Sequence, residues 1–140
     1  ALAVETRRLV GADAFLSVTV PGHLLPETQV RLAQQLQALG VDLLQTEGAS
    51  RMLSEEPRVL SLPAGEKAAL TLRNTELLAD ATRLPVMTAS GMDARSSGRA
   101  LHSGASAVGI GSAVNKLETE AEMIAELNAV RKAVDLAATK

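Results

Sequence analysis

The sequence predicts an α/β protein, more specifically the last five βα units of a (β/α)8 barrel. Short apolar segments alternate with helical ones, and this alternation is typical of a parallel sheet. Each expected strand has one bulky apolar face and one small or polar face, which favours a barrel over a sheet covered on both sides. The last two expected strands end in small residues, as do the phosphate-binding strands seven and eight of such barrels.

The strands are expected to follow joints at which a helix is stopped. Gly11, Gly40 and Gly104 can each take the left-handed conformation after a last helical residue, and Pro85 ends a helix at a fourth joint. Apolar segments begin within a few residues of each joint. The strands predicted in this way run over residues 14–20, 41–47, 68–72, 85–90 and 106–111.

The expected helices lie between and after these strands. They run over residues 26–39, 74–82, 93–102 and 119–138, and the irregular stretch 49–66 is expected to be a long loop with a short helix. Thr119 and Glu122 have the spacing of a capping box at the start of the last helix. An apolar stripe on that helix predicts its buried face, formed by Ile124, Leu127, Val130 and Val134.

Strand side chains alternate between two faces. The bulky apolar face is predicted to carry Leu16, Val18 and Val20, then Leu44, then Leu70 and Leu72, then Met87, then Val108 and Ile110. The opposite face is predicted to carry Ser17 and Thr19, then Gln45 and Glu47, then Ala69, Thr71 and Arg73, then Thr88 and Ser90, then Ala107, Gly109 and Gly111. In a barrel the first set meets the outer helices and the second set lines the lumen.

The length of the chain sets the domain organisation. A complete barrel takes about 250 residues and eight strands, whereas this chain has 140 residues and five expected strands. Residues 1–140 are therefore predicted to form a single partial barrel domain, strands four to eight, with the first three strands not in this chain. The chain begins without an initiator Met, so we expect a processed or partial protein. A small doubly wound, flavodoxin-like sheet is the alternative.

Composition excludes several function classes. The net charge is −2 and Phe15 is the only aromatic residue, so we expect no nucleic-acid partner. The chain has no Cys, which excludes disulfides and thiol catalysis. No apolar run approaches the roughly 20 residues of a transmembrane helix. No spacing of acidic or His residues indicates a metal site, and we predict no cofactor.

Four segments resemble one known family. They are Leu16-Ser-Val-Thr-Val-Pro21, Asp42-Leu-Leu-Gln-Thr-Glu-Gly48, Leu84-Pro-Val-Met-Thr-Ala-Ser-Gly91 and Gly104-Ala-Ser-Ala-Val-Gly-Ile-Gly-Ser-Ala-Val-Asn115. Their order and spacing are similar to the uncharacterised plastid and cyanobacterial proteins called hypothetical chloroplast reading frame twenty-three. The resemblance implies a (β/α)8 barrel with no assigned reaction. It also implies a location in the chloroplast stroma, at the stromal face of the thylakoid, or in the cyanobacterial cytoplasm.

The ends of the last two strands are the predicted anion site. Backbone N–H groups at Gly91, Gly111 and Ser112 are expected to hold a phosphate, assisted by the hydroxyls of Ser90 and Ser112. The N-terminus of a following helix would add positive potential. The alternative is that these glycines only let strands and helices pack closely.

Glu47 and Arg73 are the candidate catalytic residues. Each is expected at the same end of neighbouring strands, where Glu47 would act as a general base and Arg73 would hold an anionic substrate. Alternatively, the two form a structural ion pair. Thr19 and Gln45 on the same face are candidates for orienting a substrate. His23 follows the first strand in a loop, where it either titrates near neutral pH or is simply solvated.

Two function classes follow from these residues. The first is an enzyme or ligand binder for a small phosphorylated metabolite, based on the phosphate-type strand ends and Glu47. The second is a non-catalytic accessory or docking subunit of a larger plastid or photosynthetic assembly, since a partial barrel leaves strand edges that need cover.

Overall fold

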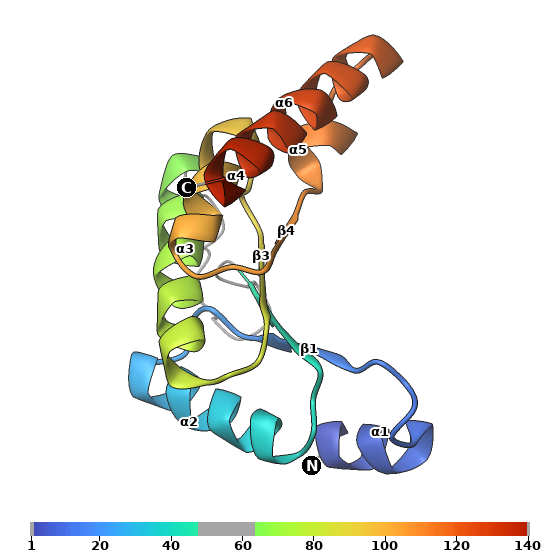
Figure 1. The fold of residues 1–140 in the computed structure, drawn as a ribbon, viewed down its shortest axis with the longest axis vertical. Helices are drawn as coiled ribbons and strands as arrows, with labels where there is room; N and C mark the ends of the chain where they lie inside the picture. The colour runs from blue at the N-terminus through green and yellow to red at the C-terminus, as the bar shows by residue number, and fades with distance from the viewer. Residues whose placement is uncertain (1, 48–63, 140) are drawn as a thin grey trace, which may run out of the picture.

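The computed structural model describes residues 2–47 and 64–139 (Figure 1). The elements follow one another along the chain as α1 (Leu2–Val10), β1 (Ser17–Val20), α2 (Pro26–Ala38), β2 (Leu43–Thr46), α3 (Ala64–Ala81), β3 (Val86–Ala89), α4 (Ala94–His102), β4 (Ala107–Gly109), α5 (Ser112–Asn115) and α6 (Glu120–Ala138). The strands form one sheet in the order β1-β2-β3-β4, and every neighbouring pair is parallel. The predicted α/β class is therefore confirmed.

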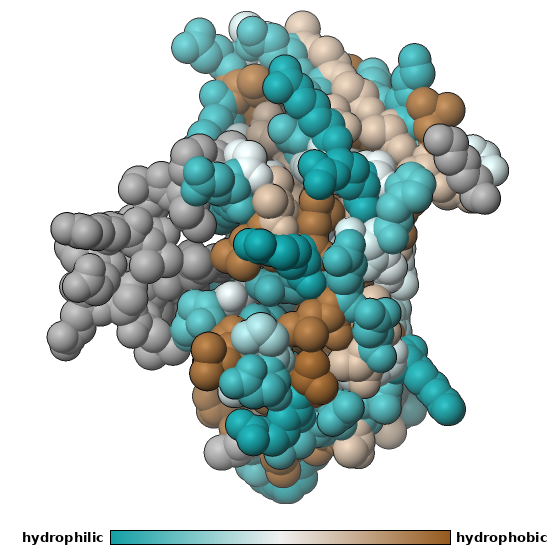
Figure 2. Space-filling view, turned by 90° about the vertical axis from the view of Figure 1, so that its left-hand side faces the viewer, coloured by the Kyte–Doolittle hydropathy of each residue, from teal (hydrophilic) through white to brown (hydrophobic). Residues whose placement is uncertain are grey.

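The main core lies on one face of the sheet. In the strand register Val18 lies opposite Leu44, and Leu44 lies opposite Val86. Leu44 and Val86 are fully buried together with Leu78 of α3, and Leu36 of α2 is buried beside them. Figure 1 shows α3 running along this side of the sheet, with α2 at one end of it and α4 at the other. Figure 2 looks onto the α3 side and shows a largely hydrophilic surface with smaller apolar patches.

The opposite face of the sheet carries smaller and more polar side chains. Thr19 is exposed, while Gln45, Met87 and Gly109 are partly buried. Gln45 pairs with Met87 in the register, and a Cβ built on Gly109 would lie 3.8 Å from the Met87 Sδ atom. These residues therefore share a face, and for β1, β2 and β4 the two faces match the predicted ones.

The predicted strand over 68–72 is wrong, because these residues lie inside α3. The buried residues Ala68, Leu72, Thr75 and Leu78 recur every three or four positions, which is the period of one helix face. A five-residue apolar run fits a strand and a helix equally well when it is considered alone. The described residues thus supply four strands in place of the expected five. The rest of the expected loop, residues 49–63, lies outside the described residues.

The faces of β3 are the reverse of the prediction. Thr88 is fully buried towards α3, where its hydroxyl lies 2.7 Å from that of Thr75, and Met87 lies on the opposite face. The Thr75 hydroxyl donates to the Thr71 carbonyl oxygen at 2.9 Å, so Thr88 acts as the donor to Thr75. A buried Thr is stable here because its hydroxyl is paired, whereas the prediction treated hydroxyls as lumen-facing.

The local signals at the helix ends are confirmed. Gly11, Gly40 and Gly104 have φ values of 75°, 79° and 89°, so each uses the left-handed conformation. Thr119 and Glu122 form a reciprocal capping box at the start of α6. The apolar stripe of α6 is only partly used, since Val130 is its one buried residue and Ile124 and Leu127 are about half exposed.

The described helices also bear on membrane association. Across residues 2–47 and 64–139, no helix is both long enough and apolar enough to cross a bilayer.

The described strands form an open sheet, so closure into a barrel and the doubly wound alternative both stay predictions.

Candidate functional site

A cavity of about 340 Å³ lies at the carboxyl ends of the strands. Its wall is built from β2, the first turn of α3, and the turns that follow β3 and β4. The residues that carry polar groups or bare backbone into it are Gln45, Lys67, Ser90, Gly91, Gly111 and Ser112. The four residues predicted for anion binding therefore line one cavity, together with Gln45.

The turn after β3 has an unusual backbone. Ser90 and Gly91 have φ values of 89° and 75°, so two successive residues are in the left-handed region. The Ser90 carbonyl oxygen lies 2.9 Å from the Thr71 hydroxyl of α3. A Cβ on Gly91 would lie 3.1 Å from the Ala68 backbone nitrogen and 3.2 Å from Lys67 Cγ. Close packing on α3 thus explains Gly91, as the alternative reading of these glycines expected.

Gly111 after β4 is different. A Cβ built on it meets nothing within 4 Å, and its φ of −127° is outside the left-handed region. Its carbonyl oxygen accepts from the N–H groups of Val114 and Asn115, both at 3.0 Å. The N–H groups of Ser112 and Ala113, at the start of α5, have no acceptor within their own helix. Packing does not require a glycine here, and Gly111 lines the cavity.

The N-terminus of α4 does not supply the positive potential that we expected. Asp93 caps it, and its Oδ1 accepts from the N–H groups of Arg95 and Ser96 at 3.0 and 2.9 Å. Glu126 of α6 accepts from the Ala94 N–H at 2.9 Å. Burial raises the pKa of Asp93, but hydrogen bonds from Ser96 and Arg95 outweigh it and hold the pKa below its usual value. The protein's own carboxylates thus occupy this helix end.

Lys67 is the cation at the cavity, and the sequence reasoning missed it. It lies in the first turns of α3 and lines the same cavity as Gln45. The prediction placed residue 67 between a long loop and a strand, and gave it no neighbours. The helical spacing of Ala68, Leu72 and Thr75 is the signal that would have placed Lys67 at the N-terminal end of a helix, beside the turn after β3.

The floor of the cavity is nearly apolar. Met87, Ala89 and Gly109 line it from β3 and β4. A Cβ on Gly109 would lie 3.0 Å from the Ala89 Cβ, so packing between the two strands accounts for this glycine. The cavity therefore combines apolar residues of β3 and β4 with polar groups at the strand ends.

The remaining predicted residues are not among those that line this cavity. Arg73 is exposed on α3, so its expected place at a strand end is wrong, and among the described residues it forms no ion pair with Glu47. Glu47 is partly buried just after β2, and its carbonyl oxygen packs against Gly22. Thr19 and His23 are exposed. The catalytic and orienting roles of these residues stay predictions.

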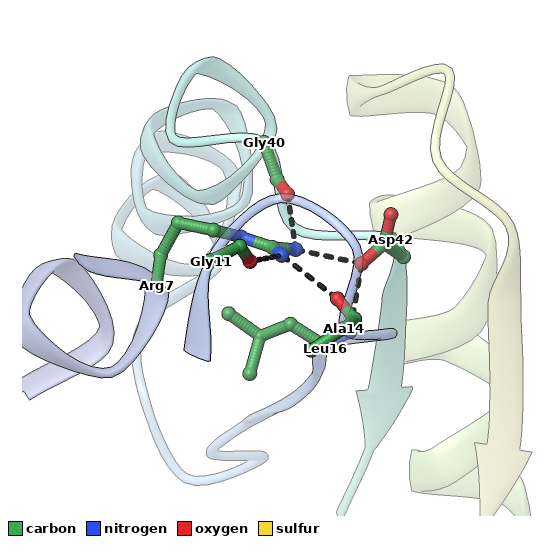
Figure 3. Close-up of polar contacts among 6 residues, drawn as sticks. All are labelled: Arg7, Gly11, Ala14, Leu16, Gly40 and Asp42. Atoms are coloured by element: carbon green, nitrogen blue, oxygen red, sulfur yellow. Dashed lines mark hydrogen bonds and ion pairs between the residues drawn. The ribbon is translucent and has the colours of Figure 1, made fainter. Parts of the chain in front are cut away.

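A second polar cluster joins the amino ends of β1 and β2 (Figure 3). The Arg7 guanidinium donates to Asp42 at 2.6 Å, and Asp42 also accepts from the Leu16 N–H at 2.7 Å. These two bonds, led by the Leu16 N–H, hold the pKa of Asp42 below its usual value. Arg7 also donates to the carbonyl oxygens of Gly11, Ala14 and Gly40. Because it joins three segments at the edge away from the cavity, this cluster is structural.

Fold and cavity together define a parallel α/β protein whose candidate ligand site is at the carboxyl ends of its strands. A family profile described as "Protein of unknown function (DUF561)" matches residues 1–140. The chain belongs to this family.

Similar proteins agree with this assignment and with the resemblance found in the sequence. An "Uncharacterized protein ycf23" of Porphyra purpurea is 37% identical over 130 residues, covering 93% of this chain and 48% of that protein. The protein of the same name from Cyanophora paradoxa is 39% identical, covering 92% of this chain and 51% of its own length. The protein of the same name from Pyropia yezoensis is 32% identical, covering 88% of this chain and 44% of its own length. The chain thus spans about half the length of these relatives.

Proposed function

We propose that this protein binds the phosphate group of a small metabolite in the cavity after β3 and β4. The observation that carries the proposal is that Lys67 lines the same cavity as the four residues predicted from the sequence, Ser90, Gly91, Gly111 and Ser112. Hydroxyls, backbone N–H groups and one ammonium are the donors from which phosphate sites are built. The volume of about 340 Å³ lies at the small end of the range for ligand pockets.

Each residue has a distinct role in this proposal. The open space at Gly111 admits an anion close to the backbone, where the N–H groups at the start of α5 lack partners within their helix. Lys67 supplies the charge that the capped α4 terminus does not supply. The left-handed backbone at Ser90 and Gly91, held by α3, keeps the other side of the site rigid.

The fold proposed for the intact protein is a (β/α)8 barrel, of which β3 and β4 are strands seven and eight. The support is that the main core lies on one sheet face, whereas smaller, more polar residues occupy the other. In that barrel Glu47 would act as general base, while Gln45 and Thr19 would orient the substrate; Arg73, on α3, has no place in this site. We propose a plastid or cyanobacterial location, since the relatives from Porphyra purpurea and Cyanophora paradoxa carry the plastid family's name.

Calorimetric titration and thermal shift with phosphate, sulfate and sugar phosphates test the proposal. We expect stabilisation by millimolar ligand and a binding constant weakened about tenfold or more in Lys67→Met, because a charge-assisted contact is lost. Lys132→Met is the matched control, since it removes the same charge from an exposed position on α6. No stabilisation of the wild type, or equal binding by both variants, would refute the site.

A second candidate function is a non-catalytic accessory or docking subunit of a larger photosynthetic or plastid assembly. The observation favouring it is that β1 and β4 each pair with one neighbour in the described sheet, so both edges are open for another chain. Stable co-purification with a complex is expected under this proposal. A chain that remains a stable monomer in lysate and in isolation would contradict it.

A further inference from the structure

The cavity after β3 and β4 has two chemically different ends. In the turn after β3, a Cβ built on Gly91 would lie 3.2 Å from Lys67 Cγ, so the Lys67 stem lies beside that turn. Gln45 of β2 lines the same cavity further back along the strands, where it pairs with Met87 in the register. A molecule that fills the cavity therefore meets a cation at one end and a neutral amide at the other.

The strand register gives the distance between these two ends. Gln45 is level with Met87, and Ala89 lies two residues further along β3. A parallel strand rises about 3.3 Å per residue, so Ala89 lies about 7 Å beyond Gln45 along the sheet. The turns that carry Gly91 and Gly111 begin directly after this level. With bonds of about 1.5 Å, a phosphate ester held at these turns reaches Gln45 through a backbone of roughly three or four carbons and one further oxygen.

Apolar groups line the cavity between its two ends. Met87, Ala89 and Gly109 form this part of the wall, and a Cβ built on Gly109 would lie 3.8 Å from the Met87 Sδ atom. Among the described residues that line the cavity, Lys67 alone carries a charge. A second anionic group would lose hydration here without gaining a counter-charge, which is unfavourable. The wall therefore suits an uncharged carbon backbone.

We propose, resting on the proposed function, that the ligand is a phosphate monoester with an uncharged backbone of roughly three or four carbons that ends in a hydroxyl or carbonyl oxygen. Its phosphate lies beside Lys67, its backbone packs over Met87 and Gly109, and its terminal oxygen bonds to the Gln45 amide. A Gln side chain offers N–H donors and a carbonyl acceptor, so it pairs with either kind of oxygen. Bisphosphates and phosphorylated carboxylic acids are disfavoured, because their second anionic group would lie at the uncharged end.

Calorimetric titration of the intact 140-residue chain with four probes tests this ligand class. Glycerol 3-phosphate has the proposed length and a terminal hydroxyl. Glycerol 2-phosphate has the same formula, but both of its hydroxyls lie closer to the phosphate. The third probe, 3-phosphoglycerate, carries a carboxylate at the far end, and inorganic phosphate occupies the cationic end alone. We expect glycerol 3-phosphate to bind at least about fivefold more tightly than each of the others, because it alone places an uncharged oxygen at Gln45.

A substitution at Gln45 tests the amide itself. Gln45→Met removes the amide and keeps nearly the same side-chain shape. It should lower the preference for glycerol 3-phosphate over inorganic phosphate, taken as the ratio of their association constants, by about fivefold. Gln34→Met is the matched control, since Gln34 is exposed on α2, and it should leave this ratio unchanged. Circular dichroism checks that both variants fold, and the comparison of probes on the wild type decides the ligand class even where Gln45→Met does not.

Three results would overturn the ligand class. They are equal binding of the two glycerol phosphates, tighter binding of 3-phosphoglycerate than of glycerol 3-phosphate, and an unchanged ratio in a folded Gln45→Met. If inorganic phosphate binds as tightly as glycerol 3-phosphate, the proposed phosphate site stands and the ligand class is wrong. If none of the four probes binds, the phosphate site and the ligand class are both wrong.

Discussion

Placing a carboxylate at Gly111 should weaken phosphate binding without unfolding the protein. A Cβ at this position meets nothing within 4 Å, so a side chain fits and points into open space beside the cavity. A carboxylate ~5 Å from a bound anion is repelled by about 3 kcal/mol at an effective dielectric constant of ~20 and by about 0.8 kcal/mol in water. The binding constant of Gly111→Asp should therefore weaken between about 4-fold and about 150-fold.

Gly111→Asn is the matched control, because Asn has nearly the same shape and no charge. Both variants are titrated with phosphate by calorimetry at low and at physiological salt. We expect Gly111→Asn to bind much more tightly than Gly111→Asp, and the gap to narrow at higher salt as the repulsion is screened. Equal binding by the two variants would show that no anion lies near Gly111, and the reasoning from its open space would fail.

Three further predictions concern stability. Leu44→Ala should lower the free energy of unfolding by about 2–5 kcal/mol in urea denaturation, because it leaves a cavity where a fully buried side chain was packed. Thr75→Val should lower the free energy of unfolding by about 1–3 kcal/mol, because the buried Thr88 hydroxyl loses its acceptor. Adding Thr88→Val should recover part of that loss. If the effects of the two substitutions are additive in the double variant, the two hydroxyls are not paired. The pKa of Asp93 in the folded protein is lower than its ordinary value of 3.8. The ionised side chain therefore stabilises the fold at pH values above 3.8, and this stabilisation is lost as the pH falls through the pKa of the folded protein. The stability difference between wild type and Asp93→Asn should therefore shrink in acid denaturation series, and a difference independent of pH would refute this role.

Features set by a few neighbouring residues could be predicted from the sequence. Gly40 ends a helix because glycine takes the left-handed backbone without steric cost, and the structure has it at a φ of 79°. Thr119 and Glu122 form their capping box because both partners lie within one turn. Ser90 and Gly111, which line the candidate cavity, could be picked out in the same way, since short strands ending in small residues are a local pattern.

Features that depend on tertiary packing could not be predicted. Leu70 and Leu72 alternate like a strand, and the helical period shows only when Leu72 is taken together with the buried Ala68 and Thr75. Thr88 was assigned to the wrong face because no local pattern indicates that its hydroxyl pairs with Thr75, 13 residues earlier in α3. Lys67 was missed because residues 49–66 were expected to form a loop and residues 68–72 a strand, so the start of α3 was not recognised.

The Arg7 cluster shows the same limit at longer range. Arg7 and Asp42 are separated by 35 residues, and neither belongs to a local motif. Their contact depends on how the segment before β1 meets the turn before β2. A charge pair of this kind can be recognised only when the fold is known.

Amide chemical shifts measured by heteronuclear NMR during a phosphate titration test the proposed site most directly. Binding in the cavity predicts that the largest shifts occur at Gly91, Gly111 and Ser112, with saturation at millimolar phosphate, while amides at the amino ends of the strands stay unchanged. Shifts that are absent, that do not saturate, or that centre on residues away from the cavity would contradict a phosphate site at the ends of β3 and β4.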